Sequence, residues 1–324
     1  MEYFFSSDES IFNGLRNHFR VLSLSLLYMI SITVQAQNKF TLVWEDNFSN
    51  YNGGHDSVAL IPNPAVWEHQ VWPPGIVNKE LEWYTADIRN SRVQNGMLIV
   101  EAHKNGDSIT SARINTNKSP IAKRQTGRIE FKAKIPQGAG TWPGLWLMPS
   151  DIFKYATTCS EQLGWTSNCD AWPNSGEIDV MEHVGRDTNR IHCGIHTKNS
   201  NFSTGTQLTK STYIASATSE FHIYAIEMYD DRMDFFIDTQ MVGSFSKPTT
   251  ADWKDWPFDQ PFYVIVNLAI GGTWGGPAVD DNMFPVRLEV DYIRMYEFNK
   301  DYNTELKPAT IINTKKQHTR RKMN

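Results

Sequence analysis

The chain has 324 residues, of which 40% are hydrophobic, 21% charged and 12% aromatic. This length suits one large domain or two ordinary ones, and the apolar content excludes disorder for most of the chain. The formal net charge of −5 argues against a nucleic-acid-binding protein, which usually carries a basic surface. The 11 tryptophans are unusual, because indole rings that the core does not need can stack on a flat ligand.

The N-terminal segment predicts export. Residues 21–34 form an uncharged, largely apolar run that follows Arg16 and Arg20. The run ends in residues 34–36 (VQA), a small-x-small pattern, so we expect residues 1–36 to be a signal peptide with a long N-terminal extension. A membrane anchor is the alternative, but the run is short for a span of about 20 apolar residues. The protein is therefore expected to be secreted or periplasmic, without a transmembrane span.

Residues 38–299 read as strands almost throughout, and no linker or repeat divides them, so we expect one domain. The run 128–135 alternates charged and apolar side chains, as in an antiparallel strand with one solvated face. No amphipathic helical pattern is longer than about ten residues. Many short strands with turns between them predict an all-β sandwich or jelly roll. The other strand-like runs are 97–103, 190–197, 221–229, 232–238, 262–270 and 287–298.

Beyond residue 300 the apolar periodicity fades and basic residues gather, so residues 300–324 are expected to be a flexible basic tail. The chain has three cysteines. Cys159 and Cys169 bracket a Gly- and Ser-containing loop, and because an exported protein permits disulfides, we expect them to pair. Cys193 lies in a strand-like run and is expected to be a buried free thiol. No cysteine or histidine spacing matches a zinc site.

The chemistry is concentrated in residues 172–183 (WPNSGEIDVMEH), which hold three acids. On a regular strand Glu177 and Asp179 share a face, whereas Glu182 points the other way. One β-bulge near Val180-Met181 would return Glu182 to the first face. Neighbouring carboxylates raise each other's pKa, and glycosidic bond cleavage needs one ionised and one protonated carboxyl group. The alternatives are a solvated acidic edge or a calcium site, which needs more oxygen ligands than this strand offers.

This strand resembles the active-site strand of glycoside hydrolase family 16, the laminarinase group, in its bulged form. Other blocks of the sequence resemble further segments of that family in the same order, over roughly Phe40 to Phe298. The resemblance implies a β-jelly-roll sandwich of two antiparallel sheets, concanavalin-like, with an open substrate cleft on its concave face. The resembling blocks are residues 44–48, 78–85, 127–130, 140–146, 195–197, 267–272 and 291–296.

The resemblance also assigns roles. Glu177 would be the nucleophile, Glu182 the general acid and then the base for water, and Asp179 a hydrogen-bond partner of the nucleophile. Side chains around the strand would bind sugar, although core packing is an alternative for each tryptophan and for the histidine. These expected substrate-binding residues are Trp142, Trp146, Trp172, Asn78, Glu80, His196 and Asn267. Arg113 and Arg124 are weaker candidates for sugar binding. For both, exposure on a solvated face is the competing interpretation.

No cofactor is expected for catalysis, but the family often carries a structural calcium ion. Its ligands here would be main-chain oxygens of Asn47 and Gly96 and the side chain of Asp291. Two segments depart from the family pattern. Residues 150–171 are long for their connection, and residues 72–77 replace an expected glycine-rich run. Both lie in regions that help to set specificity.

We therefore expect a secreted, monomeric, endo-acting retaining hydrolase of β-1,3 or mixed β-1,3/1,4 glucan such as laminarin. One alternative is a family-16 hydrolase of agar, porphyran or carrageenan, but a sulfated substrate would favour cations near the motif, where Lys and Arg do not cluster. The other is a non-catalytic glucan-binding protein, and such proteins commonly lack the catalytic carboxylates that this chain has.

Overall fold

The computed structural model describes residues 39–49, 51, 57–164 and 168–299. The predicted signal peptide (1–36) and basic tail (300–324) lie outside these residues. The chain divides into two units, one of residues 1–41 and 298–324 and one of residues 42–297. In the described part of the first unit, the rings of Phe40 and Phe298 pack 5.3 Å apart. Within the described residues, no helix has the length and apolar character that crossing a membrane requires.

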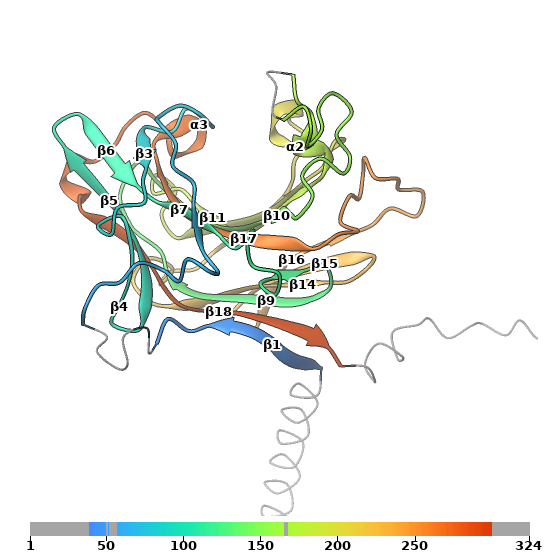
Figure 1. Cartoon of the computed structure of the whole chain (residues 1–324), viewed down its shortest axis with the longest axis horizontal. Helices are drawn as coiled ribbons and strands as arrows, with labels where there is room; N and C mark the ends of the chain where they lie inside the picture. Colours follow the sequence, from blue (N-terminus) through green and yellow to red (C-terminus); the bar gives the residue numbers. More distant parts are fainter. Residues whose placement is uncertain (1–38, 50, 52–56, 165–167, 300–324) are drawn as a thin grey trace, which may run out of the picture. The chain divides into compact units, whose positions relative to one another are not determined.

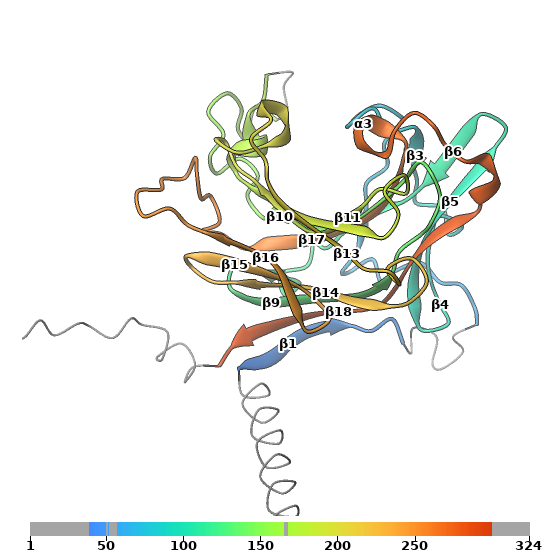
Figure 2. The same cartoon turned by 180° about the vertical axis from the view of Figure 1, so that it is seen from behind.

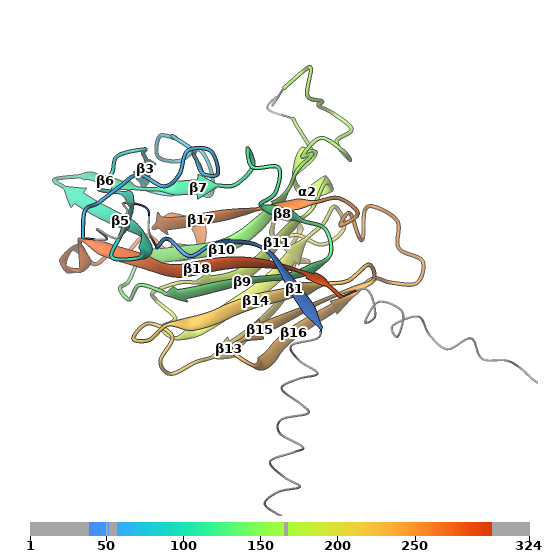
Figure 3. The same cartoon turned by 60° about the horizontal axis from the view of Figure 1, so that its bottom comes forward.

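Within the described residues, the first sheet has ten strands in the spatial order β16-β15-β14-β9-β18-β5-β6-β3, with β1 on β18 and β4 on β5. Figure 3 shows β18, β9, β14 and β15 running side by side across it. Their bounds are β1 Phe40–Asp46, β3 Glu82–Tyr84, β4 Ser91–Gln94, β5 Met97–Asn105, β6 Ser108–Ser111, β9 Gly127–Lys134, β14 His222–Met228, β15 Arg232–Ile237, β16 Gln240–Ser246 and β18 Val286–Phe298.

The second sheet has eight strands in the order β13-β12-β11-β10-β17-β7-β2, with β8 on β17. Figure 1 shows it stacked on the first sheet. Its strands are β2 Glu68–His69, β7 Arg113–Asn115, β8 Lys123–Arg124, β10 Thr141–Pro149, β11 Glu177–His183, β12 Arg190–His196, β13 Leu208–Tyr213 and β17 Phe262–Ile270. Short helices interrupt the loops: α2 Ala171–Asn174, η1 Phe202–Thr204, α3 Gly272–Gly275 and η2 Asp281–Met283.

The predicted sandwich is confirmed, with one difference. Alternate residues of each sheet fill the layer between them, among them Phe131 of β9 and Leu145 of β10. β9 alternates buried and half-buried residues, as its sequence predicts. Among the described strands, β3 and β6 form a parallel pair, although antiparallel sheets were expected. The hairpin of β5 and β6 reverses the chain, so that β6 runs in the direction of β3 where the two strands meet.

The expected bulge in β11 is present. Asp179 pairs with Gly194 and Glu182 with His192, so two residues of β11 (180–181) lie opposite the single residue between them on β12. Both bulge residues belong to the hydrophobic core. The three acids are therefore carried to the opposite face of the second sheet, from which α2 and α3 both rise (Figures 1 and 2).

A buried carboxyl group joins β3 to β17. Oε2 of Glu82 accepts a hydrogen bond of 2.8 Å from the main-chain N–H of Ile270. Its Oε1 has no hydrogen-bond partner among the described residues. Burial, followed by the charge of Glu80, raises the pKa of Glu82 to about 8. An unpaired carboxylate in such a place would be costly, so Glu82 holds a proton at neutral pH.

This proton makes stability depend on pH. Between the ordinary pKa of 4.5 and about 8, the folded state binds a proton at Glu82 that the unfolded state has lost. The free energy of unfolding therefore falls as pH rises through this window. Glu82→Gln keeps an oxygen for Ile270 and cannot ionise, so the fall should be shallower by up to about 1.4 kcal/mol per pH unit. Urea unfolding at several pH values measures this, with the exposed Glu220→Gln as control. Parallel curves for Glu82→Gln and wild type would show that Glu82 is ionised in the folded protein.

Candidate active site

Three carboxyl groups and one histidine meet on β11 and β12. Glu177 and His196 are paired across the two strands, and Asp179 follows on the same face. Nε2 of His196 lies 3.2 Å from Oδ2 of Asp179 and 3.8 Å from Oε1 of Glu177. It also lies 2.9 Å from the side-chain nitrogen of Gln207. The predicted site residues Glu177, Asp179 and His196 are thus brought together, and Asp179 is almost completely buried between them.

The burial and mutual repulsion of these acids shift their protonation. Burial, then the charge of Asp179, raises the pKa of Glu177 to about 8. The same two causes raise the pKa of Glu182 well above its ordinary value. Burial lowers the pKa of His196, but the surrounding carboxylates outweigh it and raise this pKa to about 9. Without substrate, the site therefore keeps protons at neutral pH. A side chain that acts as a general acid must hold such a proton.

Each glutamate accepts a hydrogen bond from a different indole. Nε1 of Trp172 donates to Oε2 of Glu177 at 2.7 Å, and Nε1 of Trp142 donates to Oε1 of Glu182 at 3.0 Å. Trp142 lies on β10 and Trp172 lies in the α2 turn, so the two donors come from different elements. An N–H that donates to a carboxylate stabilises its ionised form and fixes its orientation.

Further aromatic side chains, which the sequence did not single out, pack around Trp142 and Trp172. Trp274 of α3 lies edge-on to Trp142, with ring centroids 5.5 Å apart. The same ring lies 4.9 Å from the ring of His192. On the other side of the site, the exposed Phe202 packs 5.4 Å from Trp172. The aromatic surroundings of the acids are therefore wider than the three predicted tryptophans.

Only one of these additional residues had a signal in the sequence. His192 lies four strand positions before His196, so it shares the face of a residue that was predicted. Trp274 and Phe202 lie in the single-turn helices α3 and η1 between strands, which are too short for a periodic pattern to show which way a side chain points. Their contribution becomes visible only when the loops are placed over the sheet.

The remaining predicted sugar-binding residues form one network beside the acids. Nε1 of Trp146 donates to Oδ1 of Asn267 at 2.8 Å. Nδ2 of Asn267 donates to the Tyr84 hydroxyl at 3.1 Å, which donates in turn to Oε2 of Glu80 at 2.8 Å. Asn78 donates to the other oxygen of Glu80 at 3.2 Å. These side chains therefore hold one another in place.

Arg113 is part of this region, so the solvated face considered for it is wrong. Its guanidinium carbon lies 4.6 Å from the ring centroids of both Trp72 and Trp146. Its strand, β7, pairs with β17 in the register that places Arg113 opposite Asn267. Trp72 belongs to the segment 72–77 that departs from the family pattern, so this departure contributes directly to the surroundings of the site.

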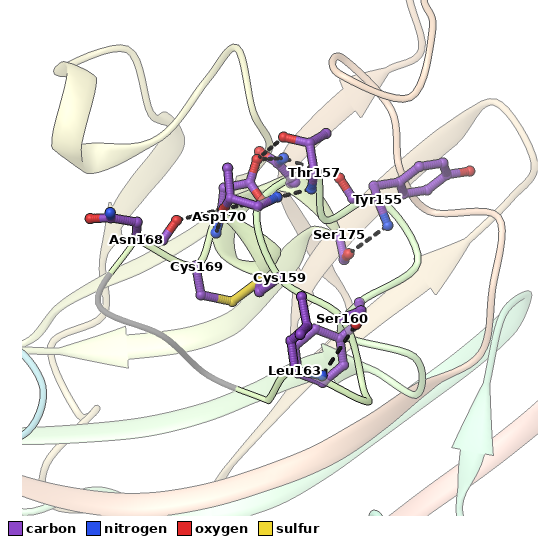
Figure 4. The surroundings of a disulfide bond; sticks show 12 residues. Tyr155, Thr157, Cys159, Ser160, Leu163, Asn168, Cys169, Asp170 and Ser175 are labelled. Carbon is purple, nitrogen blue, oxygen red and sulfur yellow. Dashed lines mark hydrogen bonds between the residues drawn. A yellow bond between two sulfur atoms is a disulfide. The ribbon is translucent and has the colours of Figure 1, made fainter.

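The other departure, residues 150–171, contains the disulfide. Cys159 and Cys169 are joined, with their sulfur atoms 2.03 Å apart (Figure 4). This is the pairing that the sequence favoured. Cys193 is a buried free thiol. The long connection ends in α2, immediately before the strand that carries Glu177.

Of the residues expected to hold calcium, Asp291 has a cationic partner. Its Oδ2 lies 2.7 Å from Nζ of Lys132. The side chain of Asn47 accepts from the backbone and hydroxyl of Ser49, whereas the expected ligand is its main-chain oxygen. Gly96 lies in the turn between β4 and β5. The structural calcium ion stays a prediction, and no step below depends on it.

Two of the acids and His196 also form a group of the kind that can hold a metal ion. Glu177, Asp179 and His196 bring three ligand atoms within 4.8 Å of one another. Calcium takes six to eight oxygen ligands, and this group offers two carboxylates and a ring nitrogen. Proton sharing therefore accounts better for the close approach of these side chains.

Comparisons with known proteins agree with this geometry. The family model described as glycosyl hydrolases family 16 matches residues 78–294. The beta-glucanase of Rhodothermus marinus is 40% identical over 266 residues, which cover 79% of this chain and 85% of the relative. The structure of the laminarinase from the same organism matches with a TM-score of 0.68 and 39% identity, over 80% of this chain and 98% of that chain. The structure of SCLam, described as a non-specific endo-beta-1,3(4)-glucanase, matches with a TM-score of 0.67 and 33% identity, over 80% of this chain and 91% of that chain. On these matches, the chain belongs to glycosyl hydrolase family 16.

Proposed function

We propose that this protein cleaves internal β-1,3 linkages of a glucan such as laminarin, or of a mixed β-1,3/1,4 glucan, with retention of configuration. The observation that carries the proposal is the bulge in β11, which puts Glu177 and Glu182 on one face with a separate indole donor for each. The Rhodothermus marinus relatives, named beta-glucanase and laminarinase, support this substrate class, and SCLam supports both linkages.

Retention requires two displacements at the anomeric carbon. In the first, an oxygen of ionised Glu177 bonds to that carbon while the glycosidic bond breaks, and Glu182 gives its proton to the departing oxygen. In the second, Glu182 takes a proton from water, whose oxygen displaces Glu177 and restores the original configuration. Nε2 of His196 lies 3.8 Å from Oε1 of Glu177, and its charge and the Trp172 N–H both favour the ionised form of Glu177. Burial and the charge of Asp179 nevertheless raise the pKa of Glu177 to about 8 and that of Glu182 well above its ordinary value, so Glu177 must give up a proton before it attacks.

The glucan would lie along the face between the loops of α2 and α3. A pyranose presents apolar C–H faces, and the indoles of Trp142, Trp172 and Trp274 offer matching flat surfaces. The polar network of Glu80 and Asn267 would bind hydroxyl groups farther along the chain. A non-catalytic glucan-binding protein would have no use for a buried Asp179 between two half-buried glutamates, whose position opposes their ionisation.

The two glutamates can be told apart by rescue with azide. Glu177→Ala and Glu182→Ala should both lose hydrolysis, by about 10²–10⁴-fold for the acid/base residue. With an activated β-laminaribioside, azide replaces the missing nucleophile of Glu177→Ala and yields the α-glycosyl azide. In Glu182→Ala, azide attacks the glycosyl-enzyme and yields the β-glycosyl azide. NMR of the products distinguishes the two. The same anomer from both variants, or undiminished hydrolysis of laminarin by Glu177→Ala, would contradict the assignment.

Trp274 tests the aromatic part of the site. Trp274→Ala removes a ring beside Trp142 but none of the acids, so KM for laminarin should rise by roughly 2- to 10-fold with a smaller change in kcat. Trp83→Ala is a matched control, because Trp83 is 48% exposed and neighbours the buried Glu82 and Tyr84 on the opposite face of β3. Equal effects of both variants on KM would remove Trp274 from the substrate path.

We also infer that the protein is exported and acts as a monomer. The apolar run before Ala36 and the Cys159–Cys169 disulfide both suit an oxidising compartment outside the cytosol. When the full sequence is expressed in a host that exports proteins, the mature protein should begin at Gln37, and light scattering should give the mass of one chain. Edman sequencing or intact mass measures the first residue. A product that keeps residues 21–34 would favour the membrane anchor instead.

A further inference from the structure

The carboxylate of Asp170 accepts several hydrogen bonds within the long connection before β11. Its Oδ1 accepts from the backbone N–H of Thr157 at 2.7 Å and from that of Thr158 at 3.0 Å. Its Oδ2 accepts from the Thr157 hydroxyl at 2.5 Å and from Nδ2 of Asn174 at 2.9 Å. Figure 4 shows Thr157 hydrogen-bonded to Asp170. The side chain is 24% exposed, and the bond from Asn174 is partly buried, whereas the bonds from the two threonines are exposed.

The disulfide lies directly beside this cluster. Cys159 follows Thr158, and Cys169 precedes Asp170, so the covalent bond joins the segment that donates to the segment that accepts. The hydroxyl of Thr158 adds a bond of 2.5 Å to the carbonyl oxygen of Asn168. The two sides of the connection are thus held together by a covalent bond and by a set of charge-assisted hydrogen bonds, which are stronger than neutral ones.

Asp170 also fixes the turn that follows it. Asn174, which donates to Asp170, is buried and donates a second bond to the carbonyl oxygen of Tyr155 at 3.1 Å. A main-chain hydrogen bond of 2.9 Å closes the turn itself. Trp172 lies between Asp170 and Asn174 in the chain, and its indole donates to Glu177. A continuous path of contacts therefore runs from Asp170 through the α2 turn to an oxygen of Glu177.

We propose that Asp170 is a positioning residue for the hydrolysis, which holds the α2 turn so that the Trp172 indole stays hydrogen-bonded to Glu177. Asp170 does not contact the carboxyl groups of the site and acts on them only through Trp172. The proposal rests on the role of Glu177 as nucleophile proposed above. It gives the long connection 150–171 a function in the reaction itself, beyond shaping one end of the substrate path.

The charge of Asp170 is essential to this arrangement. In Asp170→Asn, one carboxylate oxygen becomes an NH2 group, which cannot accept a hydrogen bond. Either Asn174 on one side or the backbone of Thr157 and Thr158 on the other then loses its acceptor. The turn would be held less firmly, and the Trp172 N–H would stabilise the ionised form of the nucleophile less well.

The substitution leaves the other charged groups around the nucleophile in place. The ionisable groups that act on Glu177 are Asp179, Glu182 and His196, together with Tyr263 of β17. Nζ of Lys198 lies 4.0 Å from Oδ2 of Asp170, and the substitution leaves this cation in place as well. Removal of the negative charge of Asp170 would by itself lower the pKa of Glu177, whereas a weaker bond from the Trp172 N–H raises it, so an upward shift reports the altered hydrogen bond.

The test is the pH profile of kcat/KM for laminarin. Asp170→Asn should move the acid limb, which reports the nucleophile, upward by roughly 0.5 to 1 pH unit, the equivalent of one neutral hydrogen bond. Trp172→Phe, which removes the N–H, should move it in the same direction. In the double variant the limb should move no further than in Trp172→Phe alone, because both changes remove one interaction. Asp259→Asn is the matched control, since Asp259 is 55% exposed and contacts Lys154 and Tyr155 of the same connection.

Additive shifts in the double variant, or a lower melting temperature of Asp170→Asn with an unmoved acid limb, would overturn the proposal. An unmoved limb in Trp172→Phe would do so too. Thr157→Val removes one donor and keeps the charge of Asp170, so it should move the acid limb in the same direction by less. This variant replaces Asp170→Asn in the test if Asp170→Asn does not fold. These results are separate from those for Glu177→Ala, whose undiminished hydrolysis would contradict the role of Glu177 itself.

Discussion

One extra residue in β11 is the constraint on which the site depends. A regular strand would turn Glu182 into the layer between the sheets, where a carboxyl group without partners is costly. With the bulge, Val180 and Met181 both fill the core, and Glu182 joins Glu177 and Asp179 on the other face. The same local irregularity therefore satisfies the core and assembles the acids. The neighbouring strands accommodate it by shifting register at the same place.

The surroundings then make two chemically identical groups unequal. Glu177 lies beside His196 and accepts from Trp172, whereas Glu182 accepts from Trp142, which packs against α3. Because the two indoles belong to separate elements, each glutamate has its own support. This separation matters for a mechanism in which one group must lose its proton before the other does. The disulfide-linked connection supports one side, and α3 borders the other.

The sequence predicted the parts of the site that depend on short-range spacing. The period of a strand requires a bulge between Asp179 and Glu182 if the acids are to act together, and the alternation in residues 128–135 required one solvated face. It did not predict the contacts of Trp274 or Arg113, because these depend on loop conformation and on which strands become neighbours. The threonine donors of the long connection had no signal either, since only the folded connection brings them to their acceptor.

The strand β17 serves two purposes at once. Val264 and Leu268 belong to the hydrophobic core, whereas Asn267 on the alternate face holds Trp146 and Tyr84. All nine of its residues are buried, so none is free to vary as a surface residue would. Adaptation of this enzyme to a different temperature by repacking the core must therefore pass through the strand that also fixes the floor of the site. Changes in heat tolerance and changes in substrate preference are therefore coupled along β17. Substitutions intended to alter only one of the two properties should be made outside this strand.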